Sequence, residues 1–306
     1  MPQWRAAAVI VPAEARTAKN SRSSTSAATS DPFASCASTV CGDRAVVSLE
    51  ATLTSRLRAV PVPSPRAKEP RGVRRLLTPG PHPGPDHAAY SNGEMARDAV
   101  ELMSALGHKR FAVAGHDRGA PVAARLVVDH RGRVSAAMLL DVAPTLDMYE
   151  ATDRDLASAY RHWFFLIQPA PMPEALVGAN PRGYVEGVMG ARHAGLGPFP
   201  PEVLDEYVAC LDGESNASGP ANDSRAANGI DLEHDRADRK AGRRTSVPLR
   251  VLWARHGVVG RLFGPLALWD QVAESISGRA VDCGHYLPEV APVQVLAEML
   301  DFFGRT

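Results

Sequence analysis

Hydrophobic positions divide the chain into stretches that look like buried strands and stretches that look like helices. Four short stretches, bounded by turn residues, read as strands, and two of them are continuous apolar runs typical of strands buried on both faces. The four are Phe111–Ala114, Ala136–Val142, Leu249–Trp253 and Arg279–Asp282. Helix-like stretches alternate with them: Asn92–Leu106, Ala120–Val128, Pro265–Ser275 and Ala291–Phe303. This alternation predicts an α/β fold with a parallel sheet.

The middle of the chain shows a different pattern. Between Thr145 and about Arg244 no buried strand is visible, and Tyr149–Leu166, Pro181–Met189 and Pro201–Leu211 read as helices. A stretch rich in Gly, Ser and Asn at 212–224 reads as a loop. We therefore predict an all-helical cap over residues 145–245, inserted between two halves of a core at 84–144 and 246–306.

Residues 1–83 fit neither pattern. They contain 12 Lys and Arg against 5 Asp and Glu, and proline clusters interrupt them at 61–65 and 79–85. Val46–Leu53 could form a strand, but the surrounding composition is typical of disordered sequence. We predict that this segment is an atypical leader, either disordered or the product of a frame error.

Composition excludes several classes of partner. The formal net charge of the 306 residues is zero, which gives no sign of nucleic-acid binding, and no apolar run approaches a membrane span. The four cysteines (Cys36, Cys41, Cys210 and Cys283) have neither metal-site spacing nor a disulfide framework. We expect a cytoplasmic protein without metal or cofactor, and the sequence leaves a homodimer open.

The sharpest local signal is Gly115-His-Asp-Arg-Gly119, between the first buried strand and a small-residue helix. Strand, tight turn and helix with small flanking residues indicate a nucleophile elbow, which pushes its central side chain outward. Here that side chain is Asp117, and a carboxylate can attack carbon to form an ester. The alternative is an aspartate that caps the following helix.

Two further polar residues follow strands of the same predicted sheet. Asp141 ends the second strand and His285 follows the last one, and ligands of parallel sheets bind at these carboxyl ends. A histidine oriented by a second carboxylate could activate the water that cleaves an ester on Asp117. Each residue alone could equally be a helix cap or a loop histidine, but together they favour a triad.

The chain resembles the α/β-hydrolase fold, and within it the haloacetate (fluoroacetate) dehalogenases, from about residue 84 to the C-terminus. The strings that carry the resemblance are Ala114-Gly-His-Asp-Arg-Gly119, Leu140-Asp-Val-Ala-Pro-Thr145, Ala159-Tyr-Arg-His-Trp-Phe-Phe-Leu-Ile-Gln-Pro-Ala-Pro171, Ile230-Asp-Leu-Glu-His-Asp-Arg-Ala-Asp238 and Cys283-Gly-His-Tyr-Leu-Pro-Glu289. The string that contains His162 and Trp163 is the most specific, because epoxide hydrolases share the elbow but not this helix.

The resemblance implies a hydrolytic dehalogenation of a haloacetate to glycolate. Asp117 would displace the halide, and His285 with Asp141 would activate water to hydrolyse the aspartyl ester. Arg118 would bind the substrate carboxylate, for which a guanidinium is well shaped. His162 and Trp163 would donate N–H groups to the leaving halide.

The sequence departs from the family pattern at three places. A second arginine is expected where Pro121 stands, and a halide-contacting tyrosine where Ser224 stands. Residues 1–83 also lack the His-Gly-x-Pro loop that completes the oxyanion hole, which leaves the N–H of Arg118 as one donor.

Two rival functions therefore stay open. The first is an epoxide hydrolase with the same triad, in which a cap tyrosine would protonate the epoxide oxygen. The candidates for that role are Tyr149, Tyr160, Tyr184 and Tyr207. The second is a catalytically impaired hydrolase remnant that has lost its oxyanion loop.

Overall fold

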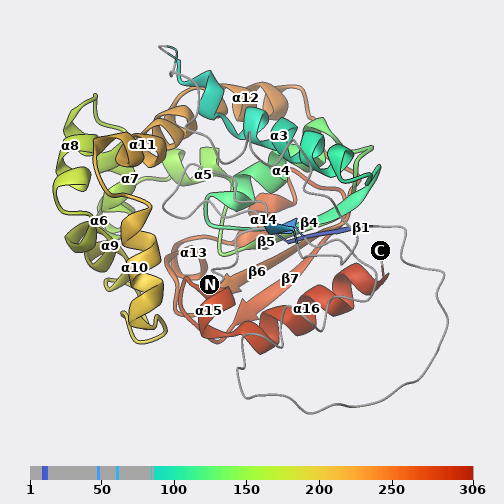
Figure 1. The fold of residues 1–306 in the computed structure, drawn as a ribbon. Helices are drawn as coiled ribbons and strands as arrows, with labels where there is room; N and C mark the ends of the chain where they lie inside the picture. Colours follow the sequence, from blue (N-terminus) through green and yellow to red (C-terminus); the bar gives the residue numbers. More distant parts are fainter. Residues whose placement is uncertain (1–8, 13–46, 49–59, 62–83, 85, 306) are drawn as a thin grey trace.

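The computed structural model describes residues 9–12, 47–48, 60–61, 84 and 86–305. A seven-stranded sheet runs through the centre in the order β3-β2-β1-β4-β5-β6-β7 (Figure 1). Its strands are β1 (Val9–Pro12), β2 (Val47–Ser48), β3 (Val60–Pro61), β4 (Phe111–His116), β5 (Val134–Leu140), β6 (Leu249–Ala254) and β7 (Ile276–Val281).

The four predicted strands are neighbours and parallel, as expected. β4 pairs with β5, β5 with β6 and β6 with β7, all in parallel register. The last strand begins at Ile276, three residues before the predicted start, because the preceding helix α14 (Pro265–Trp269) ends well short of Ser275. Residues 270–275 instead lead into the sheet edge, where Thr245 and Ala273 form an isolated bridge.

The sheet continues past β4 into three short strands of the predicted leader. β1 pairs antiparallel with β4, and β2 and β3 follow in antiparallel pairs. β2 falls inside Val46–Leu53, the stretch with strand character in the sequence. The prediction that the leader is disordered or frame-shifted otherwise lies outside the described residues.

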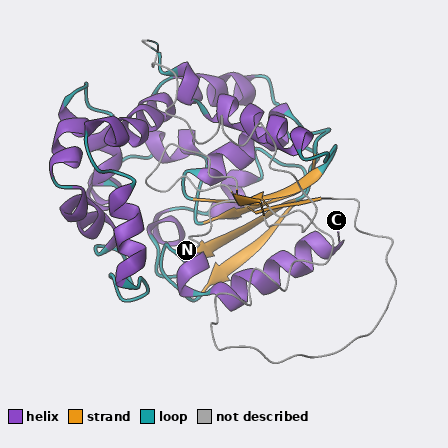
Figure 2. Cartoon of the chain, viewed as in Figure 1, coloured by secondary structure: helices purple, strands orange, loops and turns teal. Residues whose placement is uncertain are grey.

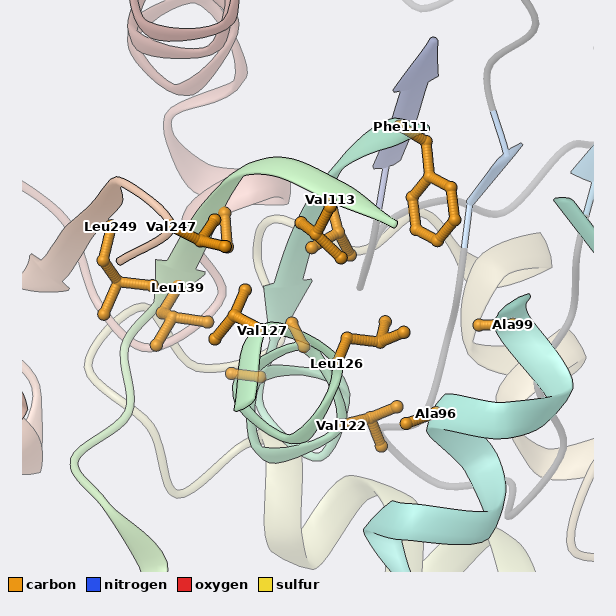
Figure 3. Close-up of a cluster of buried hydrophobic side chains, with 14 of the residues drawn as sticks. Ala96, Ala99, Phe111, Val113, Val122, Leu126, Val127, Leu139, Val247 and Leu249 are labelled. Atoms are coloured by element: carbon orange, nitrogen blue, oxygen red, sulfur yellow. The ribbon is translucent and has the colours of Figure 1, made fainter. Parts of the chain in front are cut away.

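Apolar side chains alternate between the two faces of the parallel strands. Phe111, Val113, Leu139 and Leu249 belong to the cluster under helices α3 (Asn92–Ala105) and α4 (Gly119–Asp129). Figure 3 shows Leu126 and Val127 of α4 directed at these strands, and Val122 beside Ala96 of α3. On the opposite face, Met138, Leu140 and Leu252 pack against α16 (Pro292–Arg305). Burial on both faces explains why the strands read as continuous apolar runs.

Helix α3 illustrates how local signals set element boundaries. The Ser91 hydroxyl caps its first turn by accepting the N–H of Glu94 at 3.3 Å. Gly107 follows with a φ of 87°, and the next N–H, from His108, returns to the Met103 carbonyl at 2.8 Å. A residue in this conformation closes a helix most easily when it has no Cβ, so Gly107 explains why the predicted helix ends near Leu106.

Eight helices and no strand occupy the chain between β5 and β6 (Figure 2). They are α5 (Thr145–Glu150), α6 (Arg154–Ala159), α7 (Arg161–Leu166), α8 (Met172–Ala179), α9 (Pro181–Met189), α10 (Pro201–Ala209), α11 (Glu214–Asn228) and α12 (Ile230–Lys240). We call α5–α12 the inserted helices. Short helices η2 (Ala88–Tyr90), α13 (Val258–Leu262) and α15 (Leu287–Val290) complete the described elements.

Two expectations about this region are wrong in detail. The stretch from Tyr149 to Leu166 is broken into three helices, because Asp153 caps a new helix by accepting the N–H of Leu156 at 2.8 Å. The predicted loop at 212–224 is largely helix α11, although it contains Pro220. Its low helix propensity is overcome by packing on α8, where Arg225 donates to Glu174 at 2.6 Å.

Among the described residues, no helix combines the length and the apolarity that a membrane crossing requires.

Candidate active site

Asp117 stands in a sharp turn between β4 and α4. Its φ is 48°, a left-handed conformation that few non-glycine residues adopt, and such outliers are enriched at functional sites. The turn also needs Gly115, because a Cβ there would lie 2.3 Å from the carbonyl oxygen of Gly119. The predicted elbow geometry is therefore present, and Asp117 is lifted out of the sheet rather than placed as a conventional cap.

Asp117, His285 and Asp141 form a continuous hydrogen-bonded chain. His285 Nε2 lies 3.2 Å from Asp117 Oδ2, and His285 Nδ1 lies 2.7 Å from Asp141 Oδ2. Asp141 directly follows β5, and its other oxygen, Oδ1, accepts the N–H of Ala254 at 2.8 Å. Since both His285 and Asp141 are buried, their relative orientation is fixed. The three residues that the sequence proposed as a triad are thus within relay distance.

The backbone at Asp141 repeats the unusual geometry of Asp117. Its φ is also 48°, which turns the chain sharply at the end of β5 and directs the carboxylate toward His285. A Cβ at Gly257 would lie 3.1 Å from Asp141 Oδ2, so a small residue is needed beside this carboxylate. Two left-handed aspartates in one site indicate local strain that the surrounding fold maintains.

The charges of Asp117 and His285 stabilise each other. Burial raises the pKa of Asp117, but the hydrogen bond and charge of His285 outweigh burial and hold this pKa well below its usual range. Burial lowers the pKa of His285, but its hydrogen bonds to Asp117 and Asp141 raise it overall to about 8. At neutral pH Asp117 is therefore ionised and His285 protonated.

His116 is a member of the site that the sequence interpretation overlooked. It is buried beside the elbow, and its Nε2 donates to the backbone carbonyl of His285 at 2.8 Å. Burial lowers its pKa to about 4, so the ring is neutral. The contact anchors the loop that carries His285, and the only sequence signal was its place next to Asp117.

Arg118 is engaged by a partner that the sequence did not reveal. Its Nε and Nη2 donate to the two oxygens of Asp223, each at 2.8 Å, and both side chains are buried. Although burial lowers the pKa of Arg118, the charge and hydrogen bonds of Asp223 raise it overall. The charge of Arg118 is therefore already paired within the protein, and Arg118 is not among the residues that line the cavity described below.

A cavity of about 470 Å³ reaches His285, the member of the triad that is among its lining residues. His285 and His162 line it, together with Arg192 and His193 from the segment between α9 and α10. His193 stacks on His256 at 4.4 Å between ring centroids, which joins that segment to the loop after β6. The cavity thus lies between the inserted helices and the carboxyl ends of the strands.

His162 and Trp163 differ in their surroundings. His162 lines the cavity, and burial lowers its pKa to about 3, so its neutral ring can donate one N–H. Trp163 is not among the residues lining the cavity and packs with its ring 4.8 Å from that of Tyr160. The structure therefore places one of the two predicted halide contacts at the cavity and the other in a hydrophobic cluster.

The two positions that depart from the family pattern are accounted for locally. The Ser224 hydroxyl donates to the Pro220 carbonyl at 2.7 Å inside α11, so it is committed to its own helix. Pro121 is buried in the first turn of α4, where a proline needs no N–H partner.

The sequence is similar to known proteins over about 70% of its length. The family model for the alpha/beta hydrolase fold matches residues 64–173, beginning twenty residues before the resemblance noted in the sequence. A fluoroacetate dehalogenase from Burkholderia is 37% identical over 220 residues, covering 71% of this chain and 72% of that protein. The chain belongs to the α/β-hydrolase family.

Other members of the α/β-hydrolase family agree with this assignment. A soluble epoxide hydrolase from Corynebacterium is 29% identical over 70% of this chain and 74% of its own length. A solved α/β-hydrolase structure from Nostoc is 44% identical, with a TM-score of 0.69 over 74% of this chain and 77% of that chain. The family supports hydrolase activity, and both dehalogenases and epoxide hydrolases are among its members.

Of the four tyrosines that are candidates for the acid of an epoxide hydrolase, two lie near Asp117. Burial raises the pKa of Tyr160 and Tyr184, and the charge of Asp117 adds to this in both. The Tyr184 hydroxyl is buried without a hydrogen-bond partner. Tyr149 lies instead beside Arg118, and Tyr207 packs against Phe199.

Among the residues that the structure describes, no cluster of three or more His, Cys, Asp or Glu side chains is arranged to hold a metal ion.

Proposed function

We propose that this α/β hydrolase is a haloacetate dehalogenase that acts through an aspartyl-ester intermediate, with α5–α12 as its cap. The observation that carries the proposal is the relay of Asp117, His285 and Asp141, with separations of 3.2 and 2.7 Å. An ionised carboxylate lifted out of the sheet is suited to attack carbon, and a histidine beside it is suited to activate water.

In the first step, an oxygen of Asp117 forms a bond to the α-carbon of the haloacetate, and the halide leaves with the electron pair of the carbon–halogen bond. His162, which faces the cavity, would donate its N–H to the departing halide, and Trp163 is the second candidate. Arg118 is the first candidate for contact with the substrate carboxylate, although its charge is paired with Asp223. Negative charge accumulates on the halide, so these donors act mainly in the transition state.

In the second step, His285 removes a proton from water, and the resulting hydroxide attacks the carbonyl carbon of the Asp117 ester. Collapse of the tetrahedral intermediate releases glycolate and regenerates the carboxylate. Once Asp117 is esterified it carries no charge, so the main group that raises the pKa of His285 is gone. Alkylation would therefore convert His285 into the neutral base that hydrolysis requires.

The decisive experiment stops the reaction after its first step. In His285→Ala, chloroacetate should still alkylate Asp117, and mass spectrometry should find one carboxymethyl group on the peptide that contains it. About one chloride should be released per chain. Asp117→Asn, prepared in parallel, should remain unlabelled, and equal labelling of this variant would contradict the assignment of the nucleophile.

A second candidate function is epoxide hydrolysis with the same relay. The observation in its favour is the buried hydroxyl of Tyr184, which has no hydrogen-bond partner. It lies close enough to Asp117 for the charge of that carboxylate to raise the pKa of Tyr184. Such a hydroxyl could protonate an epoxide oxygen as the ring opens. Incubation of His285→Ala with styrene oxide tests this directly, because an epoxide hydrolase would trap the epoxide on Asp117 and leave chloroacetate unreacted. A remnant without activity would trap neither.

A further inference from the structure

Arg192 enters the cavity from the segment that joins α9 to α10. It lines the cavity together with His162 and His285, so it faces the reacting groups from the side of the inserted helices. Its guanidinium carbon lies 4.9 Å from the centroid of the Tyr160 ring, which supports the cation from one face. Its Nε is buried and has no hydrogen-bond partner.

The three arginines of the cavity differ in how their charge is compensated. Arg261 is exposed and lies 4.0 Å from Asp155, the one carboxylate that lines the cavity. Arg161 is exposed and donates to the Gly187 carbonyl at 2.6 Å. No ion pair among the described residues involves Arg192. Its side chain is half-buried and hydrogen-bonds the Tyr286 side chain, its Nε has no hydrogen-bond partner, and no carboxylate within ion-pair distance balances its charge.

The nearest carboxylates do not remove this imbalance. Asp117 and Asp141 are both held by His285, which is itself cationic when Asp117 is ionised. Burial lowers the pKa of Arg192, and the surrounding acidic groups, Tyr160 and Tyr286 ahead of the two aspartates, raise it overall. The residue therefore stays charged, and a half-buried charge without an ion-pair partner carries part of the desolvation cost of a buried one. An anion bound in the cavity would offset that cost.

We propose that Arg192 binds the carboxylate of the substrate and makes the site selective for anionic 2-halo acids over neutral electrophiles. This inference rests on the proposed function, whose nucleophile and base it leaves unchanged. Arg192 would also supply a positive charge that the two expected positions do not offer. Arg118 is paired with Asp223, and proline stands at position 121.

Arg192 would hold one end of the substrate while Asp117 attacks the other. The carboxylate would accept hydrogen bonds from the guanidinium, leaving the carbon–halogen bond exposed to the nucleophile. Neither protons nor electrons pass through Arg192, so it acts by binding and orientation. A neutral amide or epoxide would forgo this charge-assisted contact, which is stronger than a neutral hydrogen bond.

The test measures binding of the product, glycolate, and of its neutral analogue glycolamide by calorimetry. Arg192→Met should weaken glycolate binding about 10- to 100-fold, the range expected for loss of a hydrogen bond between charged groups. The glycolate affinity of Arg192→Lys should lie between those of Arg192→Met and the wild type. Arg261→Met is the control, because Arg261 also lines the cavity but lies near Asp155, and it should bind glycolate like the wild type. Glycolamide binding should be the same in all four proteins.

Several results would overturn the inference. Equal glycolate affinity in Arg192→Met and wild type would do so, as would an equal loss in Arg261→Met or a wild type that binds no glycolate. Chloride release from chloroacetate, measured on the same wild-type sample, tests the proposed function separately. If glycolate binding depends on Arg192 but the wild type releases no chloride, the dehalogenase function is rejected and the carboxylate site at Arg192 is retained. If chloride is released and the KM for chloroacetate is unchanged in Arg192→Met, the dehalogenase function is retained and the carboxylate site at Arg192 is rejected.

Discussion

Replacing Asp117 by Asn should lower the pKa of His285 from about 8 by at least about one unit. The imidazole now lies 3.2 Å from the Asp117 carboxylate, which is one of the two groups that raise its pKa against the effect of burial. Asn is nearly the same size as Asp and tolerates the left-handed conformation at φ 48°, so the turn should persist.

The magnitude follows from the separation of the two groups. Opposite charges about 4 Å apart interact by about 4 kcal/mol at an effective dielectric constant of about 20. One pKa unit corresponds to about 1.4 kcal/mol, so this interaction corresponds to about three units, and the expected minimum of about one unit allows for stronger solvent screening of the pair. The hydrogen bond from His285 to Asp141, at 2.7 Å, and the burial of the ring are unchanged in Asp117→Asn. These two effects together determine the pKa of His285 in that variant.

The measurement is a titration of the His285 ring by NMR between about pH 5 and pH 9. Asp155→Asn is the matched control, because it removes a carboxylate that lines the same cavity but does not touch His285. A His285 that still titrates near 8 in Asp117→Asn would refute the reasoning. It would also remove the basis for the idea that esterification of Asp117 turns His285 into a neutral base.

Three further outcomes are expected. Gly115→Ala should unfold the elbow or abolish activity, since its Cβ would meet a carbonyl oxygen at 2.3 Å; normal activity and melting temperature would contradict this. Asp223→Asn should lower the free energy of unfolding by about 3–5 kcal/mol in denaturant titrations, because Arg118 would keep a buried charge. Stability should fall as pH drops below about 6.5, because His162 has a pKa of about 3 when folded and the unfolded chain takes up the proton first. His162→Gln should make that pH dependence shallower by up to about 1.4 kcal/mol per pH unit.

The core and the relay could be predicted from sequence because their signals are local. Buried parallel strands leave continuous apolar runs, and the order of strands places Asp117, Asp141 and His285 at one edge. Helix α11 could not be foreseen, because its residues favour loops and its stability comes from packing on α8. The partner of Arg118 lies 105 positions away, and no local pattern announces it.

Arg192 was missed for a related reason. A lone arginine after a helix is an ordinary surface residue in sequence, and only the folded chain places it over Tyr160 and beside the relay. The same holds for His116, whose contact to the His285 carbonyl spans 169 positions. Residue types and local spacing identified the groups proposed to react, whereas the groups that surround them depend on long-range folding.

The ion pair between Arg118 and Asp223 has a consequence for protein engineering. It joins α11 to the residue that follows Asp117, so a buried contact ties the inserted helices to the turn that carries Asp117. A chimera that exchanges residues 145–245 for those of another hydrolase would have to supply a carboxylate at the place of Asp223. Without it, the graft would leave a buried cation next to Asp117, and an exchange of the inserted helices would then also disturb the turn proposed to carry the reaction.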